Sequence, residues 1–482
     1  MAARVGCFAI RRGDARRKAD VASHDPDFED KLTRLRTGPY PIVELLNLVL
    51  PSGGIRYGTG SPPPYLPSSP ETVPFIRATD IKEGEIQVAN LLYVHRDQPP
   101  SMDKCRLRGR EVIVVRSGVN TGDCAPVPNS LVGAFAAYDL IVELRRGDNE
   151  TRAEYLSAFL DTRVGRAQIN VLKARSAQPH INADELGSVL VSHPPVAAQD
   201  CLLRLLQSKR LARQEKLQEA NDLLTGVDVF VLDQLGLALP VLPPRQTWAA
   251  RIQDTKDRFD ADYHSPKFRA LREKLHQGRY LLVSVDEFCP NPVSGFAAGR
   301  ADQEENPDDG VPHLRPLNIT NTAEFTFNGT KYVPRDAVRS GDIIQRGEVL
   351  FNNTNSTAWV GKTVVFSSGV TCACSNHITR LRVKRDLVSP EYVSAVFNAL
   401  RRVGYFGLLA TNFNNQAGIS VETLKGVRIP RPDPKVQNRI SAEVARRRAE
   451  AERLRSEADA LWQSAKNNFE HALLGPSRHG GT

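Results

Sequence analysis

Two sets of polar side chains in this sequence are suited to reading the edges of nucleic-acid bases. The first half contains Arg77, Arg116, Ser117, Asn120, Thr121, Arg175, Ser176, Gln178 and His180. The second half contains Arg315, Asn352, Asn353, Thr354, Asn355, Asn412, Asn414, Asn415 and Gln416. Arginine pairs in bidentate fashion with guanine, and asparagine or glutamine with adenine, each good pair contributing about 1 to 3 kcal/mol of discrimination. Any one of these residues is more typical of a turn, but clusters at equivalent places in both halves favour recognition.

The motifs that would indicate catalysis are incomplete. Ser356 to Thr363 (STAWVGKT) is one residue from a phosphate-binding loop, but it lacks the first glycine. Val364 to Phe366 behind it predicts a strand where that loop needs the start of a helix. Pro62 to Tyr65 lacks the amide or carboxylate that would hold a flipped adenine. We therefore expect no catalytic residue and no cofactor in this chain.

The cysteines indicate neither a disulfide framework nor a metal site. There are seven in the chain, an odd number, and they do not recur at equivalent positions of the two halves. Cys372, Cys374 and His377 are close together, but a second pair of ligands is missing, so we expect no metal.

Composition favours a polyanionic partner. The 482 residues carry a net charge of +9 and give a pI near 9.2, and neutralising phosphates provides most sequence-independent affinity for nucleic acid. No apolar run approaches the roughly 20 residues that cross a bilayer. The basic N-terminal residues have no adjoining apolar segment of the kind a secretory signal needs. These features predict a cytoplasmic protein without a membrane partner.

The same sequence unit occurs twice, with corresponding residues about 238 positions apart. Pro194 corresponds to Pro432, Gln199 to Gln437, Gln178 to Gln416 and Ile181 to Ile419. Longer segments also match: Arg77 to Ile81 with Arg315 to Ile319, and His24 to Leu35 with His264 to Leu275. A period of this length is that of a domain rather than of a solenoid repeat. The chain should therefore contain two similar domains with two similar working surfaces.

Each unit is predicted to position its polar loops on a compact β core between helices. Short helices are predicted at Phe28 to Leu35, Phe268 to His276, Ala153 to Arg163 and Pro390 to Arg402. Clustered β-formers predict strands at Val112 to Val115, Leu140 to Leu144, Val349 to Phe351, Thr363 to Phe366 and Ile378 to Val383.

A long helix should follow each unit, at Ala197 to Leu224 and at Lys435 to Leu474. Apolar residues at alternating spacings of three and four predict a narrow pairing stripe. Its members are Leu202, Leu206, Ala220 and Leu223 in the first helix and Ile440, Val444, Ala451, Leu454, Ala458 and Leu461 in the second. Lys209, Arg213 and Lys216 interrupt the first stripe, and Arg447 occupies one slot of the second. The two helices could pair with each other, or each could pack on its own domain.

In these features the chain resembles a specificity subunit of a type I restriction-modification system. The resemblance covers about residues 20 to 475 and rests on two recognition units, each with the late pattern Ala177 to Ile181 then Pro194-Pro195, or Asn415 to Ile419 then Pro430 to Pro432, followed by a long helix. It implies an α+β fold in which two similar β-rich target-recognition domains are joined by two long helices forming an antiparallel coiled coil. The segments would be a basic N-terminal tail (1–20), the first recognition domain (21–195), spacer helix 1 (196–236), a Pro-rich linker (237–258), the second recognition domain (259–433), spacer helix 2 (434–475) and a flexible tail (476–482).

The resemblance also implies a function. Each domain would read one half of a split, asymmetric site in double-stranded DNA. Two methyltransferase subunits that use S-adenosylmethionine and an ATP-driven motor-nuclease subunit would be the partners, and this chain would itself be non-catalytic. The first helix has a more charged stripe than the second, and Arg116 to Gly118 differs from Asn353 to Asn355, as expected for different half-sites. Two alternatives remain at this point: a recognition module of another DNA-modification or phage-defence complex, and a two-headed scaffold that binds proteins.

Overall fold

The computed structural model describes residues 25–475 apart from 148, 174–178, 238–246, 252–254, 256–257, 300–301, 304–307, 309 and 414–415. The basic tail, the C-terminal tail and most of the Pro-rich linker therefore lie outside the described residues. The chain divides into two compact units. Unit 1 comprises Met1–Glu215 and Glu457–Thr482, and unit 2 comprises Lys216–Ser456.

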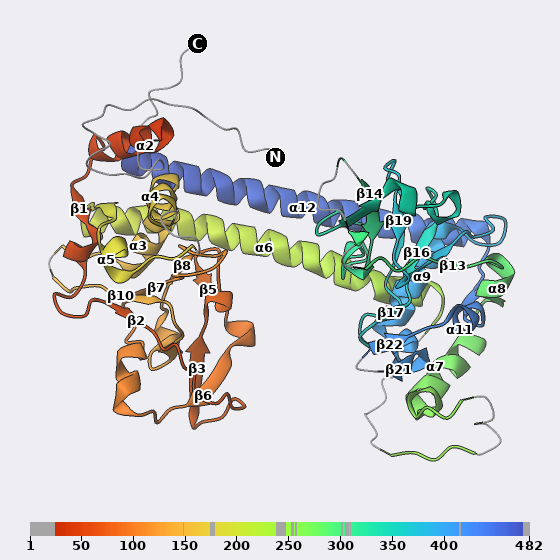
Figure 1. Ribbon diagram of the computed structural model, residues 1–482. Coiled ribbons are helices and arrows are strands. Elements are labelled where there is room, and N and C mark those ends of the chain that lie inside the picture. Colours follow the sequence, from red (N-terminus) through yellow and green to blue (C-terminus); the bar gives the residue numbers. More distant parts are fainter. Residues whose placement is uncertain are drawn as a thin grey trace, which may run out of the picture. The chain divides into compact units, whose positions relative to one another are not determined.

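Unit 1 begins with helix α2 and contains two main sheets (Figure 1). Its helices are α2 (Pro26–Arg36), α3 (Ala153–Leu160), α4 (Arg163–Lys173), α5 (Ala183–Gly187) and the first half of α6 (Val196–Gln234). Its strands are β1 (Ile42–Glu44), β2 (Ile55–Tyr57), β3 (Thr72–Ile76), β4 (Ile81–Lys82), β5 (Glu85–Ile86), β6 (Leu92–His95), β7 (Glu111–Val114), β8 (Cys124–Pro126), β9 (Phe135–Ala136), β10 (Leu140–Glu143) and β11 (Leu190–Ser192).

Unit 2 repeats most of these elements in the same order. Its helices are α7 (Pro266–His276), α8 (Val285–Phe288), α9 (Pro390–Arg402), α10 (Tyr405–Leu409), α11 (Val421–Lys425) and the first part of α12 (Pro434–Leu474). Its strands are β12 (Leu282–Ser284), β13 (Val293–Ser294), β14 (Gly310–Leu314), β15 (Lys331–Pro334), β16 (Val349–Asn352), β17 (Thr354–Asn355), β18 (Thr363–Val365), β19 (Ala373–Cys374), β20 (Ile378–Leu381), β21 (Thr411–Phe413), β22 (Gln416–Gly418) and β23 (Arg428–Pro430).

The main sheets of the two units correspond strand for strand. The four-stranded sheet has the order β2-β10-β7-β8 in unit 1 and β13-β20-β16-β18 in unit 2. The three-stranded sheet has the order β6-β3-β9 in unit 1 and β15-β14-β19 in unit 2, and each includes one parallel pair. A short antiparallel pair, β1-β11 or β12-β23, completes each unit. The duplication predicted from the sequence is therefore confirmed in the fold, and the predicted strands lie in these sheets.

The central strands are buried on both faces because each unit has three layers. Side chains alternate between the two faces of a strand. In β7, Val112 and Val114 pack toward the helices, whereas Ile113 packs toward the three-stranded sheet. In β16, Val349 and Phe351 face the helices, and Leu350 faces the other sheet. The four-stranded sheet thus forms the middle layer and holds the loops at its ends in place.

Helices α6 and α12 pack together in both units. In unit 1, Leu202 and Leu206 of α6 share a core with Trp462, Ala465 and Phe469 of α12. In unit 2, the buried contacts are made by Ala220, Leu224, Val227 and Val231 of α6 and by Ile440, Val444, Ala451 and Leu454 of α12. The early part of one helix meets the late part of the other, so the helices run antiparallel, as predicted.

Three details differ from the sequence-based expectations. Helix α6 continues ten residues past Leu224, to Gln234, because Val227 and Val231 extend its apolar stripe beyond Gly226. A separate helix, α4, follows α3 where no helix was predicted. On α12 the buried residue after Ala458 is Trp462, and Leu461 is half-buried.

Charged residues within the helix pair are accommodated by specific partners. In unit 2, Arg447 packs against the Phe230 ring at 4.8 Å and donates from Nη1 to the Gly226 carbonyl at 2.9 Å. In unit 1, Arg213 donates to both carboxylate oxygens of Glu83, at 2.6 and 3.0 Å. These partners explain how an interrupted stripe still supports pairing.

Candidate nucleic-acid interface

The two polar clusters of unit 1 meet at one end of its four-stranded sheet. The β7–β8 loop carries Ser117, which forms a β-bridge with His180. The Arg116 carbonyl accepts a hydrogen bond from the Ile181 N–H at 3.0 Å. Ser117, Asn120 and His180 are exposed. Residues that are about 60 positions apart in the sequence are thereby brought onto one surface, while Arg175, Ser176 and Gln178 lie outside the described residues.

Arg116 is held by aromatic rings from two other strands or loops. Its guanidinium carbon lies 4.9 Å from the centre of the Tyr57 ring and 4.3 Å from that of Tyr138. Cation–π contacts of this kind contribute about 0.5 to 1 kcal/mol each at exposed sites. The half-buried guanidinium is therefore restrained in orientation while its charge is kept.

A buried carboxyl group lies behind Arg116. Asp139 is 5% exposed, and burial raises its pKa to about 6, against the opposing effects of the Arg116 N–H and the Arg116 charge. The Arg116 backbone N–H donates to Asp139 Oδ1 at 3.3 Å. The charge of this carboxyl group therefore changes in the mildly acidic range.

Thr121, predicted to contact bases, is enclosed within its own loop. Its side chain is buried, and Oγ1 donates to the Gly118 carbonyl at 2.6 Å. Gly118 has a φ of +85°, so it adopts a left-handed turn that favours glycine. Thr121 closes this turn and shapes the loop that carries Ser117 and Asn120.

The corresponding loops of unit 2 form a small sheet of their own. Strands β17, β22 and β21 pair in that order, and the Asn353 carbonyl accepts from the Ile419 N–H at 2.8 Å. Gln416 and Asn412 are exposed on these strands, and Asn412 donates to Asp262 Oδ2 at 3.0 Å. Asn414 and Asn415 lie outside the described residues.

Two predicted recognition residues of unit 2 are instead structural. Asn352 and Asn353 are buried. Asn352 donates to the Trp359 carbonyl at 3.2 Å, and Asn353 donates to the Asn376 carbonyl at 3.0 Å and to Thr379 Oγ1 at 2.9 Å. The sequence predicted an exposed loop here, but the chain is still inside the sheet, so neither side chain reaches the loop surface. Thr354 and Asn355 are half-buried in β17.

Arg77 and Arg315 occupy equivalent turns that follow the central strand of each three-stranded sheet. Arg77 donates from Nη2 to Asp80 Oδ1 at 2.8 Å, and this hydrogen bond raises the pKa of Arg77. Arg315 donates from Nη2 to the Gly329 carbonyl at 2.7 Å. Both side chains stabilise their turns and remain half-buried.

Several residues near these loops gave no sequence signal. Tyr57 and Tyr138 are far from Arg116 in the chain, and only the sheet pairing brings them together. In unit 2, Lys362 is buried next to Trp359 and donates to the Ile319 carbonyl at 2.6 Å. Burial lowers the pKa of Lys362 to about 8. The strand predicted after the loop at Ser356 to Thr363 is confirmed as β18, so this loop is not followed by a helix.

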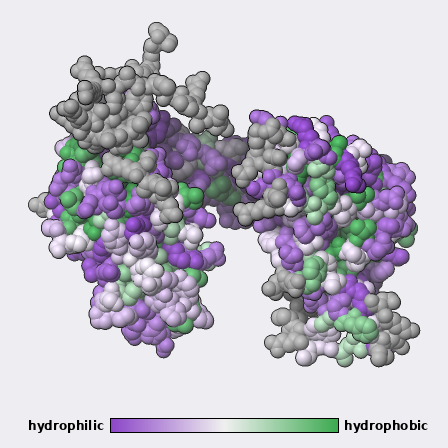
Figure 2. Space-filling view, in the orientation of Figure 1, coloured by the Kyte–Doolittle hydropathy of each residue, from purple (hydrophilic) through white to green (hydrophobic). Residues whose placement is uncertain are grey.

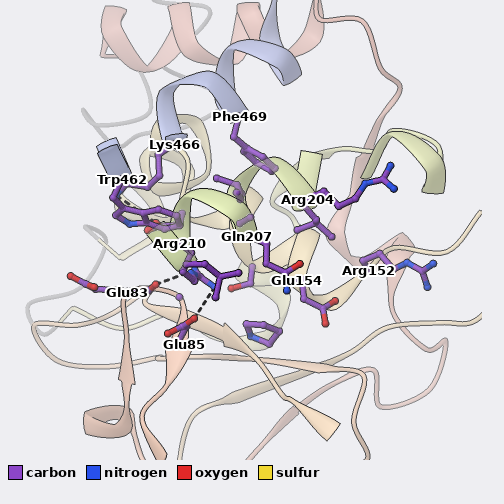
Figure 3. A pocket seen from close by; sticks show the side chains of 18 of the residues that line it. Glu83, Glu85, Arg152, Glu154, Arg204, Gln207, Arg210, Trp462, Lys466 and Phe469 are labelled. Atoms are coloured by element: carbon purple, nitrogen blue, oxygen red, sulfur yellow. Dashed lines mark hydrogen bonds and ion pairs between the residues drawn. The ribbon is translucent and has the colours of Figure 1, made fainter. Parts of the chain in front are cut away.

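A cavity of about 740 Å³ lies where the helix pair meets the β core of unit 1 (Figure 3). Trp462 and Phe469 reach it from α12, and Arg210 of α6 packs against the Trp462 ring at 5.0 Å. Arg210 also pairs with Glu85 at 3.1 Å, just after the β4–β5 turn. The cavity walls are thus fixed by ion pairs between the hairpin and α6.

The remaining surface is mainly polar on the face that Figure 2 shows, where hydrophobic side chains are scattered among hydrophilic ones. No helix in the described part of the chain is long and apolar enough to cross a membrane. Among the same residues no three or more His, Cys, Asp or Glu side chains form a group that could hold a metal ion. Burial raises the pKa of both Cys372 and Cys374 to about 12, so these thiols stay protonated at neutral pH.

The fold is that of a duplicated α+β protein with two paired long helices. Known proteins with this fold were found by comparison of structures. No protein-family model and no curated protein matches the sequence. Among solved structures, a chain from a study of complex assembly and conformational transition in the type I R-M system superposes with a TM-score of 0.52 at 16% identity, covering 91% of this chain and 98% of that one. The HsdS subunit from Thermoanaerobacter tengcongensis matches at 14% identity and a TM-score of 0.35, over 90% of this chain and 97% of the other. The type I restriction-modification S subunit from M. genitalium matches at 10% identity and a TM-score of 0.42, over 92% of this chain and 97% of the other.

The first of these likenesses spans nearly the whole of both chains. The chain therefore has the fold of a type I R-M system protein, and the resemblance indicated by the repeat is confirmed at the level of the fold.

Proposed function

We propose that this chain is the DNA-specificity subunit of a type I restriction-modification system. Unit 1 and unit 2 each bind one half of a split, asymmetric site in double-stranded DNA. The chain directs partner adenine methyltransferase subunits, and a restriction subunit, to that site.

The observation that carries the proposal is that the equivalent loops of the two units share their backbone hydrogen bonding but differ in their side chains. Each unit has a loop at the corresponding end of its own four-stranded sheet. In each, a carbonyl of this loop accepts a hydrogen bond from the N–H of a later isoleucine, Ile181 or Ile419. The loop residues themselves differ completely: Arg116 and Ser117 in one unit, Asn353 and Thr354 in the other. A duplicated frame with divergent loops is what reading two different half-sites requires.

The proposal assigns the rest of the chain as well. The recognition domains comprise residues 21–195 and 259–433, the spacer helices 196–236 and 434–475, and the linker 237–258. Two methyltransferase subunits and a motor-nuclease subunit bind S-adenosylmethionine and ATP, while this chain is non-catalytic and acts in the cytoplasm. The remaining predicted residues on the loop surfaces, Ser117, Asn120, His180, Asn412 and Gln416 among them, are proposed to contact DNA.

Exchanging one recognition unit tests this function. In cells that carry the chain with its native partner proteins, methylated adenine should occur in one split motif. Replacing residues 21–195 with the corresponding unit of a different specificity subunit should change one half of that motif and leave the other half unchanged. Genome-wide mapping of methylated adenine measures both halves. A change in both halves, or in neither, would contradict the assignment of one unit to one half-site.

A further inference from the structure

The two units carry different side chains at one equivalent position of their loops. Arg116 and Asn353 are equivalent because their carbonyls accept from Ile181 and Ile419 in the same way. The residues around them are equivalent too. Ala136 and Cys374 end the strands β9 and β19. The N–H of Gly58 donates to the Asp139 carbonyl and that of Gly295 to the Ile378 carbonyl, so the segment before this hydrogen bond is one residue longer in unit 2. Tyr138 therefore stands where unit 2 has Asn376 and His377.

A pair of glycines completes this correspondence. A Cβ atom on Gly58 would lie 1.6 Å from the Ala137 carbonyl oxygen, and one on Gly295 would lie 1.9 Å from that of Cys374. Both glycines therefore lie in direct contact with the backbone that follows β9 or β19, within one residue of the equivalent position. Tyr57 precedes one glycine and Ser294 precedes the other. Unit 1 thus has Tyr57, Arg116 and Tyr138 where unit 2 has Ser294, Asn353 and the pair Asn376-His377.

The guanidinium of Arg116 is oriented but not neutralised. It packs against the rings of Tyr57 and Tyr138. Its side chain makes no hydrogen bond or ion pair with any other residue that the structure describes in unit 1, and its Nε is buried without a hydrogen-bond partner among them. Arg116 also lines an open hollow of about 610 Å³ together with Gly58, Gly60 and Tyr138. The in-plane donors are therefore positioned for a ligand from outside the unit.

The equivalent side chain of unit 2, Asn353, has no exposed donor for an outside ligand. The Asn353 amide is buried, and it is occupied by the Asn376 carbonyl and by Thr379 Oγ1. Neither tyrosine of unit 1 has a tyrosine counterpart in unit 2, where Ser294 and the pair Asn376-His377 stand at these positions. Recognition at this position is therefore a property of unit 1.

We propose that Arg116 is a specificity-determining residue that recognises a guanine in the half-site bound by unit 1. This inference rests on the proposed function and adds the base and the residue that reads it. The planar guanidinium would donate two hydrogen bonds to guanine O6 and N7, the commonest specific contact in the major groove. Packing against Tyr57 and Tyr138 reduces the conformational entropy lost when these bonds form.

The main competing ligand for such a side chain is a backbone phosphate. A phosphate contact depends on the positive charge, and its loss would weaken binding equally for all DNA sequences. The loss of a base contact would instead relax the requirement for one base of the motif. Lysine keeps the charge but lacks the bidentate geometry. The substitution Arg116→Lys therefore separates the two cases.

The first measurement maps adenine methylation in cells that carry the wild-type chain, Arg116→Lys or Arg106→Lys with the native partners. Arg106 is a matched control, since its guanidinium packs against the Phe135 ring at 4.5 Å in the same unit but outside this hollow. Arg116→Lys should lose the requirement for one guanine in the half of the motif that unit 1 reads. The other half, and the whole motif of Arg106→Lys, should stay unchanged.

The second measurement changes the DNA and begins with the wild-type complex. Duplexes that carry the motif are made with that guanine replaced by 7-deazaguanine, which pairs normally but lacks N7. The wild-type complex should bind them roughly five- to a hundredfold more weakly. Arg116→Lys should bind the two duplexes equally, which places the lost hydrogen bond on this side chain.

Each outcome bears on a different statement. If wild-type cells show no split motif that depends on this chain, both the proposed function and this inference are wrong. If the motif exists but Arg116→Lys keeps it, if affinity falls uniformly for all sequences, or if 7-deazaguanine is tolerated at every guanine of that half-site, the inference alone is overturned.

Discussion

Gln199 and Gln437 are single residues that fix where each long helix begins. Gln199 Oε1 accepts from the Arg152 N–H at 2.9 Å, and Nε2 donates to the carbonyls of Glu150 at 3.0 Å and Pro194 at 2.9 Å. Gln437 makes the corresponding three hydrogen bonds in unit 2. Both side chains are buried. This bonding explains why these glutamines recur in the sequence repeat.

Replacing Gln199 with alanine should therefore destabilise unit 1. The change leaves one backbone N–H and two carbonyls without partners in a buried site, which should cost about 2 to 4 kcal/mol of unfolding free energy. Urea denaturation of the full chain measures the loss. Gln463→Ala on the exposed face of α12 is the control and should change stability by less than about 0.5 kcal/mol. Equal stability of Gln199→Ala and wild type would contradict the role given to this side chain.

Asp139 should make the stability of unit 1 depend on pH. Burial raises its pKa to about 6 in the folded state, whereas an unfolded aspartate titrates near 3.9. Because the folded state binds the proton more tightly, this group's contribution is fully present below about pH 4 and is lost as the pH rises through about 6. Two pKa units correspond to about 3 kcal/mol.

Asp139→Asn removes this titration while leaving an oxygen that can accept from the Arg116 N–H. The free energy of unfolding, measured in urea at pH 4.5 and pH 7.5, should fall with rising pH by about 2 kcal/mol more in the wild type than in the variant, since part of the titration already lies below pH 4.5. Parallel pH profiles would show that Asp139 is not responsible.

At the residue scale the sequence could give residue types but not burial. Arg116 and Asn353 both stand in polar runs after a strand, and the chain alone does not reveal that one is held at the surface and the other is enclosed. Tyr57 and Tyr138 lie in unremarkable segments, and their contact with Arg116 depends on pairing between distant strands. Burial of polar side chains is thus a tertiary property here.

At the scale of elements, the paired helices of unit 2 depend on a few close contacts. Leu454 is 2% exposed and packs with Ala220, Leu224 and Ala451. Leu454→Ala should lower the stability of unit 2 by about 2 to 5 kcal/mol, because it removes buried methyl groups and leaves a cavity.

Urea denaturation again provides the measurement. Ser456→Ala, two residues along on the exposed side of the same helix, is the control and should be nearly neutral. A small effect of Leu454→Ala would mean that α6 and α12 contribute little to each other's stability in unit 2.

Helices and strands with a regular pattern of apolar residues could be predicted from the sequence. Elements whose position depends on contacts with other elements could not. The strands β7 and β16 are short apolar runs, which identified them. Helix α4 begins at Arg163, where the predicted helix was expected to end. In the structure Gly165 lets α4 approach α3 closely, since a Cβ there would lie 2.4 Å from the Phe159 carbonyl oxygen. Gly226 likewise lies inside α6, where it makes room for Arg447 of α12.

At the scale of the whole molecule, the period of 238 residues carried most of the information. It predicted two equivalent units, and the matching sheet orders confirm them. It could be read from weak similarity because buried residues such as Ile181 and Ile419 keep the same partner in each unit.

The net charge of +9 leads to a prediction about binding by the whole molecule. If the proposed function holds, the affinity of the complex for a duplex containing its split motif should fall steeply with salt. Six to ten phosphate contacts would lower this affinity by about 10³- to 10⁵-fold between 50 and 200 mM salt.

A random duplex of equal length should bind more weakly but with a similar salt dependence, because phosphate contacts do not depend on sequence. The ratio of the two affinities should change much less, since base contacts release few counterions. Titrations at four salt concentrations measure both quantities, and a salt-independent affinity, or none for duplex DNA, would instead favour a two-headed protein scaffold.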